Sequence, residues 1–407
     1  MSSSSTPTAV TPFAEIRALE EQYLFPTYAR VPLLLERGKG VYVYASDGKK
    51  YLDCITGIGV NALGHAHPRV LAAIREQSRR LIHASNLYYN AYQGPLAQRL
   101  TALSGMERAF FTVSGAEAVE GALKVARSVA QRISADKIGV VALEHSLHVR
   151  TLGALSITGQ PKYRAPFGAL LPGVHFVPAN DLAALEAAVS ERTCAVFLEP
   201  VQGEGGIYEL TPEYLATAAR LARQYQALLV CDEIQCGLGR TGKPFAHQWN
   251  NLAPDVVVTA KPIACGYPLG AILARGAAAT ALTAGTHGTT FGGGPLACRL
   301  GLEFLDILAE PKTLPHIAAM GAALKEGLQK LARKHASVKE VRGKGLMIGV
   351  QLDRPAAALF QSLLDQDVLA NVTHETIIRL LPPYIIESKH VDKVLRSFAR
   401  ALKAQPA

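Results

Sequence analysis

Short apolar runs that alternate with helical patterns are the feature of this sequence that most limits its fold. The helical patterns include Asp181–Val189 and Pro212–Tyr225. Continuous apolar runs joined by helices are typical of parallel strands that are buried on both faces. We therefore predict an α/β fold with a mostly parallel central sheet and helices on both faces. The expected strands are 109–113, 139–143, 195–198, 228–231, 256–260 and 271–274.

The sequence pattern changes on both sides of this region, which predicts a second, smaller unit. Near the start, Asp47-Gly48 separates two β-prone runs and predicts a hairpin. After Pro295, helical and strand-like stretches mix, as in an α+β domain. The expected organisation is a disordered tail (1–12), an N-terminal segment that joins the small domain (13–68), a large domain (69–296) and a small domain (297–407).

Composition and charge exclude several classes of protein. Of the 407 residues, 49% are hydrophobic and 18% are charged, which favours a packed core over disorder. The net charge is +9, but the basic residues are scattered, so we expect a site for acidic small molecules and no nucleic-acid partner. No apolar run reaches the ~18 residues of a membrane span, and we expect no membrane association.

The six cysteines form no Cys-x-x-Cys pair, which favours buried thiols in a reducing compartment and no metal site. Residues 1–22 contain no apolar core of a signal peptide, so we expect a cytoplasmic protein. His65 and His67 could suggest a metal site, but a turn before a helix that starts near Pro68 is favoured, because no third ligand is nearby.

An acid and a lysine directly follow two of the expected strands. Asp232 ends the run at 228–231, and Lys261 ends the run at 256–260. Ligands bind beyond the carboxyl ends of strands in such sheets, so both side chains should reach one crevice. A lysine with a lowered pKa is suited to Schiff-base chemistry, and a carboxylate facing a pyridinium nitrogen suits pyridoxal phosphate. We expect Lys261 to carry this cofactor and Asp232 to tune it; the alternative is a turn aspartate and a surface lysine.

Three other strand ends carry segments that could contact a ligand. Ser114–Ala118 opens a helix whose free N–H groups could hold a phosphate, although Ser114 could also be an ordinary N-cap. Arg150 could bind a carboxylate in two-pronged fashion or form a surface salt bridge. The loop Glu199–Gly206 places glycines around two acids, which indicates either close approach to a ligand or a flexible surface loop.

Two later segments add weaker signals. In the glycine-rich loop Gly285–Pro295, Thr289 and Thr290 could donate hydrogen bonds to a phosphate. Arg379 precedes a Pro-Pro pair and could meet a second carboxylate. Each signal alone is weak, but their joint occurrence in this order is specific.

Taken together, these residues resemble the class III, fold-type-I pyridoxal-phosphate aminotransferases from about Tyr28 to the C-terminus, and among them most closely the acetylornithine aminotransferases. The motifs that carry the resemblance are 28–32, 57–65, 114–118, 160–163, 199–204, 232–235, 237–242, 259–261 and 285–298.

The resemblance implies a role for each cofactor residue. Lys261 would form the Schiff base and move the proton between the substrate carbon and C4′, while Asp232 would keep the ring nitrogen protonated. The phosphate would be held by the helix start, and Gln235 would lie beside the phenolic oxygen. The remaining cofactor residues implied are Ser114, Gly115, Ala116, Leu147 over the ring, and Thr290 reaching the phosphate of the partner subunit in a homodimer with shared active sites.

The resemblance also implies how substrates bind. Arg150 would bind a substrate carboxylate and Thr289 would lie near the substrate. Arg379 would bind the α-carboxylate of glutamate or 2-oxoglutarate, and Glu204 would pair with Arg379 when the amino donor is an ω-amine. This gate lets one site accept two kinds of donor.

The expected reaction moves the terminal amino group of N-acetylornithine to 2-oxoglutarate, giving N-acetylglutamate semialdehyde and glutamate in arginine biosynthesis. Gly57 favours this donor, because ornithine aminotransferases usually carry a tyrosine there and its absence leaves room for the acyl group. The alternatives are ornithine, 4-aminobutyrate or another ω-amine as donor, a racemase, mutase or decarboxylase of the same fold type, or a non-catalytic relative.

Several positions depart from the family pattern, among them Val119, Pro262–Cys265 and three positions near the expected ring and phosphate. Leu147 replaces the usual phenylalanine and lacks aromatic stacking, which is worth about 1 kcal/mol. Val149 replaces a glycine, so a positive φ at this position would be costly. Gly294 replaces the usual asparagine before Pro295.

Overall fold

A seven-stranded sheet forms the centre of the large domain in the computed structural model, which describes residues 12–404. Its strand order is β4-β12-β11-β10-β7-β5-β6, and β12 alone runs antiparallel to its neighbours. The predicted α/β fold with a mostly parallel sheet is confirmed. The strands are β4 (Arg108–Thr112), β5 (Gly139–Leu143), β6 (Val174–Val177), β7 (Thr193–Leu198), β10 (Leu228–Asp232), β11 (Val256–Thr259) and β12 (Gly270–Ala274).

Both faces of this sheet are buried, which explains the continuous apolar runs. In β10, Leu228 and Val230 belong to one hydrophobic cluster, whereas Leu229 and Cys231 belong to another. Helix α5 (Gly115–Gln131) packs on the first face, and α9 (Pro212–Gln224) lies against β10 and β7 on the other. The other helices of this domain are α4 (Gln93–Ser104), α6 (Leu152–Ser156), α7 (Pro161–Arg164), α8 (Leu182–Ala188) and α10 (Pro295–Leu308).

The sequence pattern did not predict β6, which lies at the edge of the sheet. His175 interrupts its short apolar run, and the side chains of this strand are mostly exposed or half-buried. An edge strand buries less apolar surface than a central one, so its sequence signal is weaker.

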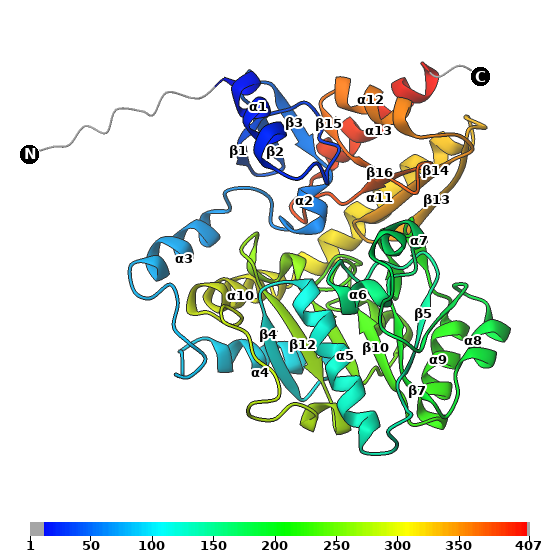
Figure 1. Ribbon diagram of the computed structural model, residues 1–407. Helices are drawn as coiled ribbons and strands as arrows, with labels where there is room; N and C mark the ends of the chain where they lie inside the picture. The colour runs from blue at the N-terminus through cyan, green and yellow to red at the C-terminus, as the bar shows by residue number, and fades with distance from the viewer. Residues whose placement is uncertain (1–11, 405–407) are drawn as a thin grey trace, which may run out of the picture.

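The C-terminal part forms a second sheet with the order β13-β14-β17-β16, all antiparallel. The N-terminal hairpin belongs to a third sheet, where β3 pairs in parallel with β15, so an early and a late segment of the chain lie side by side (Figure 1). The strands are β1 (Leu35–Lys39), β2 (Tyr42–Ala45), β3 (Lys50–Asp53), β13 (Val338–Lys344), β14 (Met347–Leu352), β15 (Val368–Leu369), β16 (Asn371–Thr373) and β17 (Ile377–Leu380). The helices are α11 (Thr313–Ala332), α12 (Ala357–Asp365) and α13 (Ser388–Lys403).

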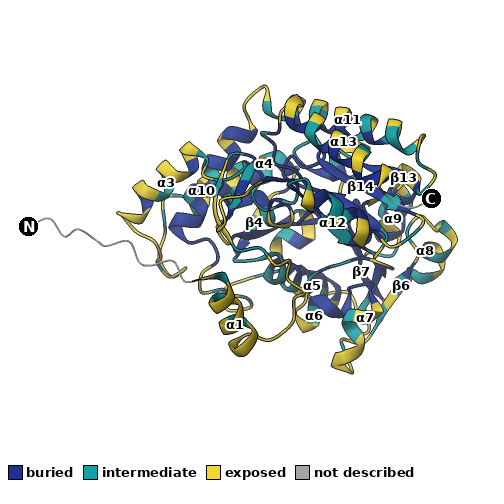
Figure 2. Cartoon of the chain, turned by 90° about the horizontal axis from the view of Figure 1, so that it is seen from above, coloured by how far each residue is buried: buried dark blue, intermediate teal, exposed yellow. Residues whose placement is uncertain are grey.

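Burial is uneven across the molecule (Figure 2). The central sheet is buried, whereas α1 (Phe13–Tyr23) and α3 (Pro68–Ser78) expose most of their side chains. Helix α3 begins at Pro68, where the sequence predicted a helix start. Within residues 12–404, no helix is both long and apolar enough to cross a bilayer. The domain boundaries stay a prediction, and the expected tail lies outside the described residues except for Pro12.

Candidate active site

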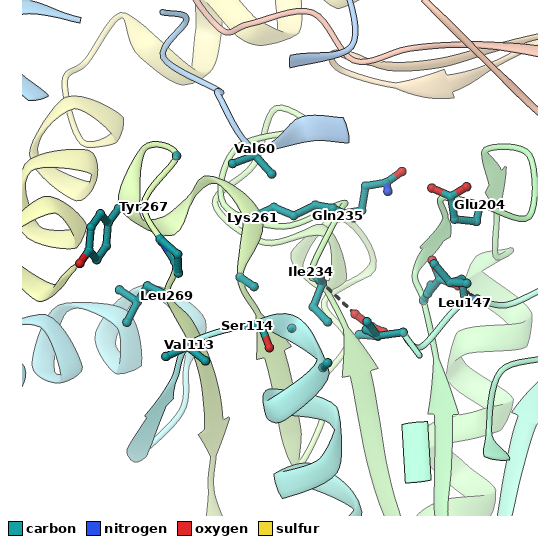
Figure 3. A pocket seen from close by; sticks show the side chains of 18 residues that line it. Val60, Val113, Ser114, Leu147, Glu204, Ile234, Gln235, Lys261, Tyr267 and Leu269 are labelled. Atoms are coloured by element: carbon teal, nitrogen blue, oxygen red, sulfur yellow. Dashed lines mark hydrogen bonds between the residues drawn. The ribbon is translucent and has the colours of Figure 1, made fainter. Parts of the chain in front are cut away.

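A cavity of about 370 Å³ lies at the carboxyl ends of the central strands (Figure 3). It is large enough for a cofactor-sized molecule. Eight of the residues predicted for the site line it: Ser114, Gly115, Ala116, Leu147, Glu204, Asp232, Gln235 and Lys261.

The register of two adjacent strands brings the acid and the lysine into this cavity. Strands β10 and β11 are parallel, and Asp232 is paired with Val258. Lys261 follows three residues later, just past the end of β11. The two side chains therefore lie at the same edge of the sheet, as expected for strand-end residues in a parallel sheet.

Both oxygens of Asp232 have partners, and this fixes its carboxylate. Oδ1 accepts a hydrogen bond from the Ile234 N–H at 3.1 Å, and Oδ2 lies 2.7 Å from Nδ1 of His148. Burial acts to lower the pKa of His148, but the hydrogen bond and charge of Asp232 outweigh this and raise the pKa. His148 and the Ile234 N–H thus hold the Asp232 side chain in a fixed position at the cavity.

The environment of Lys261 favours the neutral amine. Burial lowers its pKa, and the nearby charge of Arg379 acts in the same direction, against the opposing charges of Glu204 and Asp232. A neutral amine is the nucleophilic form, so this position is suited to covalent chemistry with a carbonyl group.

A buried ion pair lies beside the lysine. Arg379, on β17, is fully buried, and its Nη1 lies 2.5 Å from Oε1 of Glu204 and 3.1 Å from Oε1 of Gln235. Its Nε donates to Oδ1 of Asn371 at 3.1 Å, while Nη2 is buried and has no hydrogen-bond partner among residues 12–404. Burial acts to raise the pKa of Glu204, but Arg379 lowers it below its ordinary value. The guanidinium thus keeps one donor group available for another acceptor.

The start of α5 offers an anion site on the opposite wall. Ser114 caps the helix, because its Oγ accepts from the Glu117 N–H at 3.3 Å. The first N–H groups of a helix have no partners within the helix and attract anions. At Gly115 a Cβ would lie 2.7 Å from Cδ1 of Ile234, so a larger residue would require the Ile234 side chain to shift.

This set of groups fits pyridoxal phosphate. The helix start of α5 would hold the phosphate, Asp232 would face the ring nitrogen, and Lys261 would supply the amine. Leu147 lines the same cavity as an apolar cover. Among the described residues, two further buried polar atoms have no hydrogen-bond partner: Oγ1 of Thr259 and Nε2 of His148.

Val149 adopts the costly backbone conformation that its side chain disfavours. Its φ is +80°, although a β-branched residue rarely takes up this region. The Thr158 hydroxyl lies against this segment: it accepts from the His148 N–H at 2.9 Å, and its single proton has two acceptors in reach, the Ala154 carbonyl at 3.1 Å and the Val149 carbonyl at 3.3 Å. Strain of this kind persists where surrounding contacts fix the chain.

Four predicted residues do not line the cavity: Arg379 contacts Glu204 and Gln235 from behind the lining, and the other three lie away from it in this chain. Arg150 is exposed, and its guanidinium stacks 3.5 Å from the centre of the Tyr163 ring. Thr289 and Thr290 border a separate hollow with Glu117, and the Thr289 hydroxyl donates to Glu117 Oε2 at 3.2 Å. The expected roles of Arg150, Thr289 and Thr290 therefore stay predictions.

Two residues at the site received no role from the sequence. His148 holds Asp232, and Glu199 lines the cavity directly after β7. Glu199 carries the same signal as Asp232, an acid at the end of an apolar run. His148 has no comparable signal, because a buried histidine resembles any other histidine until its partner is known.

The chain is similar to one family over most of its length. The family model described as aminotransferase class-III matches residues 24–402. The acetylornithine aminotransferase of Methanocaldococcus jannaschii is 43% identical over 380 residues, which cover 93% of this chain and 96% of that protein.

Solved structures agree with this similarity. An ornithine aminotransferase of Toxoplasma gondii, described with pyridoxal phosphate at partial occupancy in its active site, has a TM-score of 0.93 and 32% identity, covering 97% of this chain and 95% of that chain. The acetylornithine aminotransferase of Elizabethkingia anophelis has a TM-score of 0.86 and 30% identity, covering 97% and 100%.

Proposed function

The chain belongs to the class-III aminotransferases, and we propose that it moves the terminal amino group of N-acetylornithine to 2-oxoglutarate. It is a transaminase with pyridoxal 5′-phosphate as cofactor and takes a small-molecule amino donor and a keto-acid acceptor. The products are N-acetylglutamate semialdehyde and glutamate, which places the reaction in arginine biosynthesis. The observation that carries this proposal is the Glu204–Arg379 pair beside Lys261, at 2.5 Å.

Pyridoxal phosphate, when bound, supplies the electron sink that lets an amino group leave one carbon and join another. Asp232, held by His148, would keep a proton at the ring nitrogen. Lys261 would hold the cofactor through its amine, and its Nζ would move the proton at the reacting carbon. Leu147 and Val149 line the cavity and would exclude water from the ring.

The ion pair gives one cavity two binding modes. With Glu204 paired, the charge of Arg379 is neutralised, and the terminal amine of a long donor can enter without a carboxylate partner. When glutamate or 2-oxoglutarate binds, its α-carboxylate competes with Glu204 for Arg379, whose unpartnered Nη2 adds a second donor. This supports a reaction with two unlike substrates in turn.

The donor is chosen at the N-terminal side of the cavity. Val60 lines the cavity, and Gly57 lies three residues earlier in a left-handed turn with φ of +63°. A Cβ at Gly57 would meet only Asn61 Nδ2, at 3.4 Å, and Val60 Cβ, at 3.8 Å. The open space at this position supports an acylated α-amino group.

The test is a single-turnover absorbance experiment on the cofactor-loaded enzyme with N-acetylornithine, ornithine and 4-aminobutyrate separately. We expect N-acetylornithine to convert the cofactor to its amino form fastest. A faster reaction with ornithine or 4-aminobutyrate would show that the chain is an aminotransferase with a different preferred donor. If no amine converted the cofactor, the chain would be a non-catalytic relative of these enzymes.

The proposal includes a homodimer with shared active sites. Thr290 lies outside the cavity of its own chain, where it could reach the phosphate bound by a partner. Asn86 donates to the Gly292 carbonyl at 3.0 Å and joins this loop to a segment that exposes Leu87 and Tyr88, at 85% and 72%. Exposed apolar side chains of this kind mark interfaces.

Two measurements test the homodimer. Thr290→Ala should lower cofactor affinity, and sedimentation of the wild type should give twice the chain mass.

We also propose a cytoplasmic location. All six cysteines are free, and five of them are buried. This pattern suits a reducing compartment. Fractionation of expressing cells with an antibody to the chain would test the location.

A further inference from the structure

A buried carboxylate joins two loops of the site that are far apart in sequence. Oε1 of Glu199 accepts a hydrogen bond from the Leu147 N–H at 3.0 Å, and Oε2 accepts one from the Gly203 N–H at 2.9 Å. Glu199 is 5% exposed and directly follows β7. A group anchored on the central sheet thus holds the backbone of both loops.

The first loop covers the cavity. It carries Leu147, which lines the cavity, and the strained Val149. Between them, His148 is tied to Asp232 through its ring. The hydrogen bond from Leu147 to Glu199 therefore fixes the position of Leu147 relative to Asp232, the acid that would face the cofactor ring.

The second loop carries the gate. Glu204 follows Gly203 and pairs with Arg379. Gly203 lies so close to Gln235 that a Cβ would be 2.3 Å from its Oε1, the atom that accepts from Arg379. A displacement of Gly203 would consequently move Glu204 and Gln235, the two side chains that accept hydrogen bonds from Nη1 of Arg379.

We propose that Glu199 is a positioning residue that couples the cover of the cofactor to the Glu204–Arg379 gate and thereby sets the preference for an ω-amine over an α-amino acid. The identity of these donors rests on the proposed function. The contact requires a carboxylate, because both oxygens accept hydrogen bonds, whereas an amide offers one acceptor oxygen and turns its NH₂ group toward a backbone N–H.

The groups around Glu199 act on its pKa in opposite directions. Burial raises its pKa to about 7, and the charge of Asp232 also raises it. His148 and the two backbone N–H groups oppose this effect by favouring the ionised form. The hydrogen bonds to the two loops thus help to retain a carboxylate in a buried site.

Hydrogen exchange tests the contact without reference to activity. The variant is Glu199→Gln, and the control is Asp255→Asn, which alters a carboxylate that accepts from the Leu229 N–H at 2.8 Å at the other end of β10. With and without cofactor, Glu199→Gln should speed exchange in peptides covering 145–150 and 201–206 together. The control should speed exchange in neither. Faster exchange in only one of the two peptides, or in neither, would overturn the proposal.

The two half-reactions provide the second measurement. Stopped-flow rates of the loaded variant with N-acetylornithine and with glutamate should show about a tenfold greater loss for N-acetylornithine, the effect of one weakened charge-assisted hydrogen bond. Equal losses would indicate general structural damage and would overturn the role in selectivity. If Glu199→Gln does not fold, Glu199→Asp, which keeps the charge but has a shorter reach, is measured in the same way. A wild type that fails with N-acetylornithine would contradict the proposed function, while hydrogen exchange would still decide the contact.

Discussion

His148 and Asp232 form a buried pair, with Nδ1 and Oδ2 2.7 Å apart and side chains 0% and 4% exposed. We expect His148→Leu to lower kcat, because Asp232 would keep only the Ile234 N–H and could turn away from the cofactor. Loss of a hydrogen bond to a charged group costs about 1.5–3 kcal/mol, which corresponds to a 10- to 100-fold decrease. Steady-state kinetics and titration with pyridoxal phosphate measure the effect.

His148→Asn is the control for this prediction. Its amide N–H₂ can donate toward Asp232, so part of kcat should return. A leucine variant with wild-type kcat would remove His148 from the mechanism.

Removal of Glu204 should separate the two half-reactions. Glu204→Ala leaves the fully buried Arg379 without its closest acceptor, so its charge is free to repel a terminal amine. We expect a loss of about 10- to 100-fold with N-acetylornithine and a smaller change with glutamate. Rapid-mixing rates with each donor provide the measurement. Glu209→Ala, which breaks the half-buried pair with Lys344, is the control and should spare both rates. Equal losses in the Glu204 variant would refute the gate.

The lowered pKa of Lys261 predicts a pH-dependent stability of the cofactor-free protein. Between the folded-state pKa and the ordinary value of 10.5, the unfolded chain binds a proton at Lys261 and the folded chain does not. Stability therefore rises with pH across this window, by up to about 1.4 kcal/mol per pH unit. Lys261→Met cannot bind this proton and lacks the effect.

Urea denaturation of wild type and Lys261→Met over pH 7–10 tests this prediction. The free energy of unfolding of the wild type should increase relative to the variant as pH rises. A constant difference would mean that the pKa is not lowered. The same variant should have no turnover with any donor.

Much of the fold could be predicted because its strands are buried on both faces. The run at 228–231 became β10 and the run at 256–260 became β11, each within one residue of its predicted end. The placement of Asp232 and Lys261 in one cavity followed from this, since parallel strands end at one edge of the sheet. The short strand β6 was missed because His175 is exposed and interrupts its apolar run, and Val174 and Phe176 are only half-buried.

Contacts between distant segments could not be predicted in this way. Nothing local to Glu199 indicates that its two oxygens bind the N–H groups of Leu147 and Gly203. Thr290 shows a second limit, because its predicted role requires a partner subunit, and within its own chain it borders a separate hollow. Residue type and spacing thus predict which side chains lie at the end of a strand, whereas tertiary packing determines which groups each side chain contacts.

The strain at Val149 predicts an unusual response to substitution. Val149 and Val174 are both partly buried and pack against the same hydrophobic cluster, but only Val149 has a positive φ, at +80°. Val174→Gly should destabilise the protein through lost packing and the greater freedom of glycine in the unfolded chain. Val149→Gly carries the same losses but also removes backbone strain of about 1–3 kcal/mol. We therefore expect Val149→Gly to cost at least about 1 kcal/mol less than Val174→Gly, as measured by urea denaturation of the cofactor-loaded enzyme. Equal costs would show that the Thr158 hydroxyl does not hold Val149 in a strained conformation.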